Sequence, residues 1–305
     1  MKKKNAISAV CYGEVLWDVF PTHKKIGGAP LNVALRMNSM GVKTNMISRV
    51  GTDSNGDEIV SFLKENELNV DEIQIGQEYK TGVVNVMINE KGNAYYDIAY
   101  PSAWDKIEKT EGMENLITQA DVFVFGSLAS RDEVSRETLF SLLNMAKYKV
   151  LDANLRAPYY TNEVLTSLML QADFIKLNDE ELREISSALD SPYNSFEQNI
   201  KFIAETTNTK QLCVTKGEYG AVLYYNGKFY YNSGYFVKVV DTVGAGDSFL
   251  ASLLLRLLRG KSPQKALNYA CAVGALVAGQ EGANPKISGQ EIKKFMMLDK
   301  SKIKK

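Results

Sequence analysis

Apolar and polar residues follow two different periods along the chain. Short, continuous apolar runs predict buried strands, and they fall at residues 8–12, 44–50, 122–126, 149–151, 174–177 and 211–215. Between them, apolar residues recur at helical spacing, which predicts helices at residues 30–40, 56–66, 133–147, 163–170, 180–188 and 196–205. Strand and helix alternate, so we expect an α/β fold in which helices cover both faces of a doubly wound, mostly parallel sheet.

Two segments interrupt the alternation of strands and helices, and their patterns predict β-hairpins. The runs 219–225 and 228–231 flank Asn226-Gly227, a dipeptide typical of two-residue hairpin turns, and we expect this hairpin to extend the edge of the main sheet. The runs 81–88 and 93–99 flank residues 89–92 and lie between α/β units. A sheet inserted there would project from the main body and could cover a cleft, although an ordinary sheet edge is the alternative.

The stretch 236–258 carries the chemistry that stands out most. An apolar, β-branched run at 236–240 predicts a buried strand, the turn Gly244-Ala245-Gly246 follows, and a helical pattern continues to Leu258. The first amides of a helix lack internal partners and the aligned peptide dipoles make that end positive, so this turn could cradle an anion. Asp247 lies in the same turn, which suits phosphoryl transfer to a hydroxyl. An aspartate at a helix start is also a common cap, and the local pattern leaves both readings open.

Composition narrows the classes of function. The 36 basic residues balance the 36 acidic ones, which argues against a partner that is a nucleic acid or a membrane surface. Cys11, Cys213 and Cys271 are far apart, so we expect reduced core residues of a cytoplasmic protein rather than a disulfide framework or a zinc site. No apolar run approaches the roughly 18 residues that a membrane span needs.

The string DTVGAGDSFLA, residues 241–251, resembles the C-terminal signature of the ribokinase-like (PfkB-type) carbohydrate kinases. Other motifs that resemble this family occur in the expected order between about residues 7 and 285. The resemblance implies one ribokinase-like domain over residues 1–305, with a three-layer α/β/α body and a small β-lid formed by about residues 13–26 and 80–104. It also implies that Asp247 is the catalytic base and that the amides of Gly244, Ala245, Gly246 and Asp247 form an anion hole.

The N-terminal motifs resemble the sugar-binding segments of that family. GEVLWDVFP and GGAPLNVA contain Asp18, Gly28 and Asn32, and the resemblance implies that these residues contact the sugar. The sequences of these two motifs are similar to those of fructokinases. The motif LDANLR is also similar, although Ala153 replaces the usual proline. The resemblance implies that Arg156 in this motif would hold a phosphate or a substrate carboxylate. A surface ion pair is the alternative role for Arg156.

Two further motifs resemble the nucleotide and metal sites of the family. KLNDEE contains Asn178 and Glu181, which would place Mg²⁺ through water, although their spacing is also that of an ordinary capping box. VTKGEYGAV supplies Thr215, Lys216 and Gly217, which the resemblance places beside the phosphates of ATP. A monovalent cation near Asp241 is doubtful here.

The resemblance therefore implies ATP-dependent phosphorylation of a sugar, with D-fructose as the expected substrate and fructose 6-phosphate as the product. Kinases for 2-keto-3-deoxygluconate or for another sugar or nucleoside are alternatives within the same fold, and a catalytically silent sugar sensor is the alternative outside enzymes. The expected partners are the sugar and ATP. The apolar hairpin of the lid also permits a homodimer.

Overall fold

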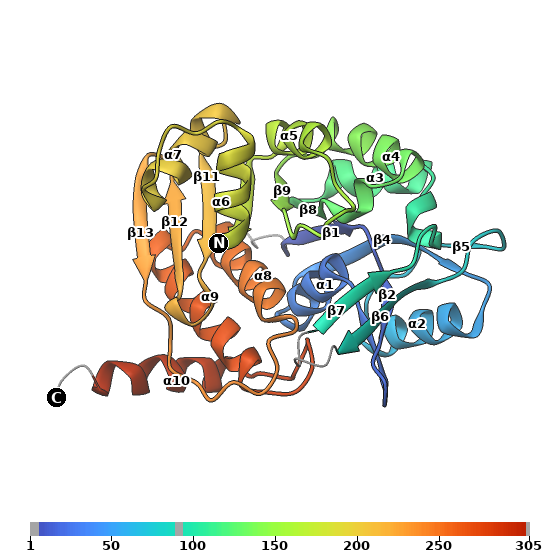
Figure 1. Cartoon of the computed structure of the whole chain (residues 1–305). Coiled ribbons are helices and arrows are strands. Elements are labelled where there is room, and N and C mark those ends of the chain that lie inside the picture. The colour runs from blue at the N-terminus through green and yellow to red at the C-terminus, as the bar shows by residue number, and fades with distance from the viewer. Residues whose placement is uncertain (1–5, 89–93, 303–305) are drawn as a thin grey trace. The chain divides into compact units, whose positions relative to one another are not determined.

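The computed structural model describes residues 6–88 and 94–302, and the chain divides into two compact units, residues 1–147 and 148–305. In each unit, strands and helices alternate along the chain, as the apolar pattern predicts (Figure 1). Among the described residues, none of the helices combines the length and the apolar character that crossing a bilayer would require.

The first unit contains four parallel strands in the order β8-β1-β4-β5. Their bounds are Val122–Gly126, Ser8–Tyr12, Lys43–Gly51 and Ile73–Gly76. The strands β1 and β8 are almost entirely buried, as their continuous apolar sequences predict for a sheet covered on both faces. The helices of this unit are α1 (Ala29–Ser39), α2 (Ser54–Glu65), α3 (Glu111–Gln119) and α4 (Glu133–Leu143).

A second, smaller sheet is inserted into the first unit. It contains four strands in the order β3-β2-β6-β7, with bounds Lys24–Gly27, Leu16–Val19, Gly82–Ile88 and Ala94–Ile98 (Figure 1). The strand β2 pairs with β3 antiparallel and with β6 in parallel, while β6 and β7 form the expected hairpin. The turn predicted for this hairpin, residues 89–92, lies outside the described residues. The expected inserted β-sheet is therefore present.

The second unit has three parallel strands, β9 (Lys149–Asp152), β10 (Phe174–Asn178) and β11 (Gln211–Thr215). The antiparallel hairpin of β12 (Ala221–Tyr225) and β13 (Lys228–Asn232) extends them. Asn226 and Gly227 join its strands with φ angles of 49° and 83°, as a two-residue turn with two positive φ angles requires. This predicted hairpin and its place beside β11 are confirmed.

Six helices accompany these strands in the described part of the second unit: α5 (Asn162–Gln171), α6 (Asp179–Ala188), α7 (Phe196–Thr206), α8 (Ala245–Leu258), α9 (Pro263–Ala278) and α10 (Gly289–Lys302). The helices α8 and α9 pack side by side (Figure 1). Every residue of α8 from Ser248 to Leu255 is buried, so the N-terminal turn of α8 is anchored by a mostly apolar helix body.

The strand predicted at residues 236–240 is wrong. The chain between β13 and α8 is extended but is not part of a sheet, and Phe236 is 82% exposed. The amides of Val240 and Asp241 both donate to the carbonyl of Ala278 at the C-terminal end of α9. Because those hydrogen bonds go to a helix end, no strand ladder forms, and the β-branched side chains remain outside the core.

Candidate phosphate and sugar sites

The N-terminal turn of α8 is built on Gly244, which caps the helix in a left-handed conformation with φ 73°. A Cβ at this position would lie 2.6 Å from the Cα and the carbonyl oxygen of Ala283, so both backbone conformation and space require glycine. The carbonyl of Gly244 accepts the amide of Ser248 at 2.9 Å, which closes the first helical turn. The helix therefore begins at Ala245, inside the glycine turn that the sequence predicts to lead into it.

The first turn of α8 contains the residues that sequence reasoning assigned to the anion hole. The amide of Ala245 already donates to the carbonyl of Thr242 at 3.2 Å, so this amide is engaged within the protein. Gly246 and Asp247 follow it in the turn, and both are half-buried. Asp247 thus lies at the surface of the core rather than inside it, and its role toward a hydroxyl stays a prediction.

Asn178 and Glu181 form a complete capping box at the start of α6. The side chain of Asn178 accepts the amide of Glu181 at 2.8 Å, and Glu181 Oε2 accepts the amide of Asn178 at 2.7 Å. Glu181 Oε1 also accepts the amide of Leu155 at 2.8 Å. Burial raises the pKa of Glu181 above its ordinary value, and Lys176 and these amides offset the effect only in part.

Lys176 and Asp152 lie beside this capping box, and sequence reasoning missed both. Lys176 Nζ pairs with Asp152 Oδ1 at 2.7 Å, and the two side chains are 9% and 5% exposed. Burial alone would lower the pKa of Lys176, but Asp152, Glu181 and Asp247 act together to raise it. The available signal was a lysine inside the otherwise apolar strand β10, with the sequence FIKLN.

Thr215, Lys216 and Gly217 follow one another at the end of β11. Thr215 Oγ1 donates to the carbonyl of Leu177 at 3.4 Å, which ties this strand end to β10. Lys216 Nζ lies 5.6 Å from the ring centroid of Phe196, and Gly217 has a φ of 54° with open space where a Cβ would be. These residues remain predicted nucleotide contacts.

Arg156 lies in the loop that follows β9, and its side chain is exposed. Its guanidinium donates to the carbonyl of the neighbouring Leu155 at 3.0 Å. The surface ion pair considered for this residue does not occur among the ion pairs of the described residues. Its role toward a substrate stays a prediction.

The first unit brings the predicted sugar residues together. Asp18 lies on β2 opposite Lys25 of β3, and its carboxylate occupies the space where a Cβ at Gly27 would be. Gly28 has a φ of 117° and lies against the carbonyl of Glu14. The carbonyl of Gly28 in turn accepts the amide of Asn32 at 2.9 Å. Asp18 therefore lies beside the glycine turn from which Asn32 follows.

The donor set of the second unit fits a magnesium ion only through water. Among the described residues, no cluster of three or more acidic, histidine or cysteine side chains is arranged to hold a metal directly. Each oxygen of Glu181 already accepts one backbone amide, which leaves a further lone pair on each for a water molecule. Magnesium keeps several of its waters and takes few protein ligands, so Glu181 and Asn178 are compatible with it.

Asp241 is the residue near which a monovalent cation was considered. Its Oδ1 accepts the amide of Val243 at 3.0 Å, and its Oδ2 accepts the amide of Gly282 at 3.1 Å. The carboxylate thus fixes the loop that leads into α8.

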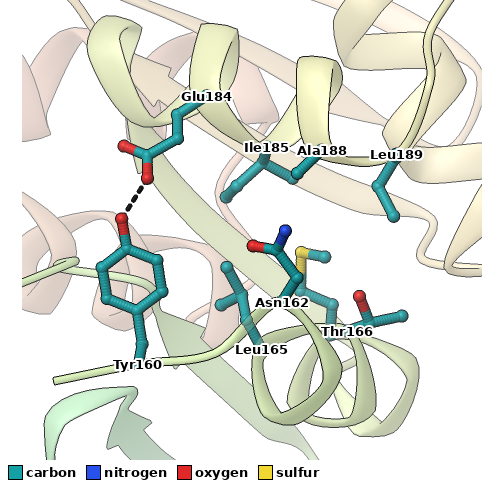
Figure 2. Close-up of a pocket in the computed structure, with 9 residues that line it drawn as sticks. Tyr160, Asn162, Leu165, Thr166, Glu184, Ile185, Ala188 and Leu189 are labelled. Carbon is teal, nitrogen blue, oxygen red and sulfur yellow. Dashed lines mark hydrogen bonds between the residues drawn. The ribbon is translucent and has the colours of Figure 1, made fainter. Parts of the chain in front are cut away.

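A shallow pocket between α5 and α6 lies elsewhere in the second unit. Figure 2 shows the hydroxyl of Tyr160 turned toward the carboxylate of Glu184 at one side, with Leu165 and Ile185 among the other lining residues. The nine lining residues, all within the described chain, include no lysine, arginine or glycine. This pocket therefore offers no basic side chain to a phosphate.

Known proteins support the assignment that this geometry suggests. The family model described as pfkB family carbohydrate kinase matches residues 3–288. Probable fructokinase-5 from Arabidopsis thaliana is 29% identical, with 96% of this chain and 98% of the relative covered. Probable fructokinase-7 from the same plant is 31% identical, with 90% and 88% covered.

Solved structures agree on the fold. Fructokinase with bound ATP from Xylella fastidiosa superimposes with a TM-score of 0.83 at 22% identity, with 96% of this chain and 99% of that one covered. The 2-dehydro-3-deoxygluconokinase from Thermotoga maritima gives 0.82 at 21% identity, with 96% and 99% covered. The predicted fold is confirmed as ribokinase-like α/β, with a mostly parallel sheet flanked by helices. Since the family model spans nearly the whole chain, the protein belongs to the pfkB family of carbohydrate kinases and is a sugar kinase.

Proposed function

We propose that this sugar kinase transfers the γ-phosphoryl group of ATP to the 6-hydroxyl of D-fructose, which yields fructose 6-phosphate and ADP. The observation that carries the proposal is the start of α8, where Gly244 opens the helix in a left-handed conformation and Asp247 stands half-buried in the first turn. Relatives named fructokinases cover nearly the whole chain, which favours fructose over other sugars.

The proposed reaction forms one P–O bond and breaks another. The sugar oxygen attacks the γ-phosphorus, the bond between that phosphorus and the β–γ bridging oxygen breaks, and ADP leaves with the bond electrons. Asp247 orients the hydroxyl and accepts its proton, a role worth about 10²–10⁴ in rate for a well-placed general base. The amides of Gly246 and Asp247 at the positive end of α8 stabilise the charge on the moving group.

The proposed sugar site lies in the first unit. Asp18 supplies a carboxylate that accepts hydrogen bonds from neighbouring hydroxyls, and Asn32 supplies both a donor and an acceptor. Gly28 lets the backbone approach the ring because it has no Cβ. Asn32 is 5% exposed, so its side chain is held in place before a sugar arrives, which reduces the entropy cost of binding.

Glu181 and Asn178 would hold magnesium through water, and Thr215, Lys216 and Gly217 would lie beside the phosphates of ATP. When bound, the metal neutralises charge on the phosphate oxygens. The capping box of Asn178 and Glu181 keeps this carboxylate in one orientation, and Lys176 lies beside it as a counter-charge.

A substrate panel tests the proposal directly. Release of ADP by the purified protein is measured with fructose, 2-keto-3-deoxygluconate, ribose and adenosine in turn, at saturating ATP and magnesium. We expect fructose to give the highest kcat/KM by at least tenfold. Preference for 2-keto-3-deoxygluconate would instead assign Arg156 to its carboxylate, and no substrate-dependent ADP release would favour the silent sugar sensor.

We also propose that two copies pair through the small sheet and that the protein works in the cytoplasm. Met87 and Tyr96 of this sheet are 48% and 53% exposed, and because Tyr96 lies opposite Val86 in the register, they leave one large apolar side chain accessible on each face of the sheet. Cys11, Cys213 and Cys271 are free and buried, as a reducing compartment favours. Light scattering measures the molar masses of the wild type and of Tyr96→Lys and so tests the pairing. Monomeric masses for both proteins would contradict it.

A further inference from the structure

Lys176 occupies a place that helix electrostatics disfavour. Its ammonium lies against the N-terminal turn of α8, where a Cβ on Gly246 would be 3.6 Å from Nζ and 3.9 Å from Cε. The N-terminal end of a helix carries a partial positive charge, so cations are favoured at the opposite end. The ammonium therefore gains nothing from the dipole of α8, and its position depends on other charges.

The surrounding charges show that the ammonium is not simply one half of a structural ion pair. Three carboxylates, those of Asp152, Glu181 and Asp247, act on Lys176. One oxygen of Asp152 holds the ammonium, while its Oδ2 is buried with no hydrogen-bond partner among the described residues. A buried pair used only for stability would be expected to satisfy all its polar atoms.

Gly246 supplies an independent observation. It is a helical residue, its φ is not among the positive values, and a Cβ there would meet nothing closer than the end of the Lys176 side chain among the described residues. Neither backbone conformation nor packing therefore requires glycine, although glycine is a poor helix former. Without a side chain, Gly246 does not cover the ammonium of Lys176, whose side chain is 9% exposed.

We infer that Lys176 is a phosphate-binding residue of this kinase: Asp152 holds its ammonium beneath the first turn of α8, and Gly246 leaves it open to the phosphoryl group that is transferred. The inference rests on the proposed phosphoryl transfer at this turn. Bound anionic phosphate accounts for a cation at the positive end of a helix, because the amides and the ammonium then face the same negative charge.

Four variants separate this role from a structural one. Lys176→Met removes the ammonium but leaves Asp152 buried and unpaired, so it could fail to fold. The double variant D152N/K176M removes both charges, keeps the net charge of the protein and keeps side chains of similar size. Lys176→Arg retains the cation, and Gly246→Ala covers it with a methyl group without removing it.

Binding of the non-hydrolysable analogue AMP-PNP and of ADP, with magnesium, is measured by calorimetry, together with the melting temperature and kcat. We expect D152N/K176M to bind AMP-PNP at least tenfold more weakly, to lose less affinity for ADP, and to lose at least 100-fold in kcat. Lys176→Arg should recover most of the AMP-PNP affinity. Gly246→Ala should weaken AMP-PNP binding while its melting temperature stays the same or rises.

The inference is overturned if folded D152N/K176M binds AMP-PNP as the wild type does, or if its affinities for AMP-PNP and for ADP fall by the same factor. Failure of the proposed function looks different, because the wild type itself would then show no sugar-dependent release of ADP. The binding measurements do not depend on turnover, so they judge Lys176 in either case.

Discussion

The α-helices α1 and α8 each follow a glycine with a positive φ, and the charges around the two helix starts differ. The helix α1 follows Gly28, with a φ of 117°, and its first turn contains Pro30 and Asn32. The helix α8 follows Gly244, with a φ of 73°, and its first turn contains Asp247. In both, the glycine is packed against another backbone segment, so the two starts share a construction.

The difference lies in what surrounds each start. At α1, a neutral amide and the nearby carboxylate of Asp18 offer acceptors and donors for hydroxyl groups. At α8, a buried ammonium lies beneath the turn and a carboxylate stands in it. The comparison teaches that a glycine start only provides approach to the backbone, and we propose that the neighbouring charges decide whether a sugar or a phosphate binds there.

The largest expected effect is a loss of kcat, and it should arise at the start of α8 rather than at the start of α1. Asp247→Asn keeps the shape of the side chain but removes the proton acceptor, so kcat should fall by about 10³, within the range typical of a lost general base. Steady-state release of ADP with fructose measures it. Asp57→Asn, which changes an exposed acid in the first turn of α2, is the matched control and should leave kcat unchanged. Near-normal kcat in Asp247→Asn would remove that residue from its assigned role.

The second prediction tests whether both glycine starts are required by the backbone. Gly28→Ala and Gly244→Ala should each lower the free energy of unfolding by about 2–4 kcal/mol, because strain of about 1–3 kcal/mol at a positive φ adds to a steric conflict. Gly260, at the other end of α8, has a φ of 71° and open space where a Cβ would be. Gly260→Ala should therefore cost only about 1 kcal/mol, as measured by urea unfolding. Equal losses in all three variants would show that packing at the two starts is unimportant.

A third prediction concerns the start of α1 alone. Asn32→Ala should raise the KM for fructose about tenfold, the effect of about 1.4 kcal/mol from a lost hydrogen bond, while the KM for ATP changes little. Asn38→Ala, near the other end of α1, is the control. If Asn32→Ala raised the KM for ATP by as much as that for fructose, the division of roles between the two starts would fail.

The smallest expected effect uses a helix start that has no glycine cap. Asp53 caps α2 by accepting the amide of Gly56 at 2.9 Å, and it also accepts the amide of Thr81 at 2.9 Å. Burial would raise the pKa of Asp53, but the hydrogen bonds from Thr81 and Gly56 lower it below its ordinary value. This stabilisation is therefore present above the ordinary pKa of an aspartate and is lost as the pH falls through the lower, folded value.

Asp53→Ala should cost about 1 kcal/mol at pH 7, as for a typical helix cap, and should cost less near pH 3. Urea unfolding of the wild type and the variant at both pH values measures the difference. An identical loss at pH 3 and pH 7 would contradict a role for the charged carboxylate.

Local patterns predicted those features of the fold that depend on neighbouring residues. The turn at Asn226-Gly227, the capping box of Asn178 and Glu181 and the start of α8 all follow from short strings of residues. Each involves backbone conformations or hydrogen bonds within a few positions, which the local sequence determines. The fold class also follows, because alternating apolar periods report how each element is buried.

Features that depend on distant partners were not predictable in the same way. The run at 236–240 has a β-branched composition, but it is not part of a sheet and the amide of Val240 donates to the carbonyl of Ala278 at the end of α9. Lys176 reads locally as one polar residue in a strand, and only the folded second unit places it between Asp152 and the first turn of α8. The strand β5 and the helices α3 and α10 were also missed, because their short or weakly apolar patterns gain stability from packing rather than from local preference.

The central claim is that the start of α8 moves a phosphoryl group from ATP to a hydroxyl of fructose under the control of Asp247. Phosphorus NMR of a reaction with fructose, ATP and magnesium tests it most directly. We predict a growing sugar-phosphate signal coupled to the C6 protons, in amounts equal to the ADP formed, and no such signal over the same time with Asp247→Asn. Release of inorganic phosphate without a sugar ester, or equal ester formation by Asp247→Asn, would contradict the account.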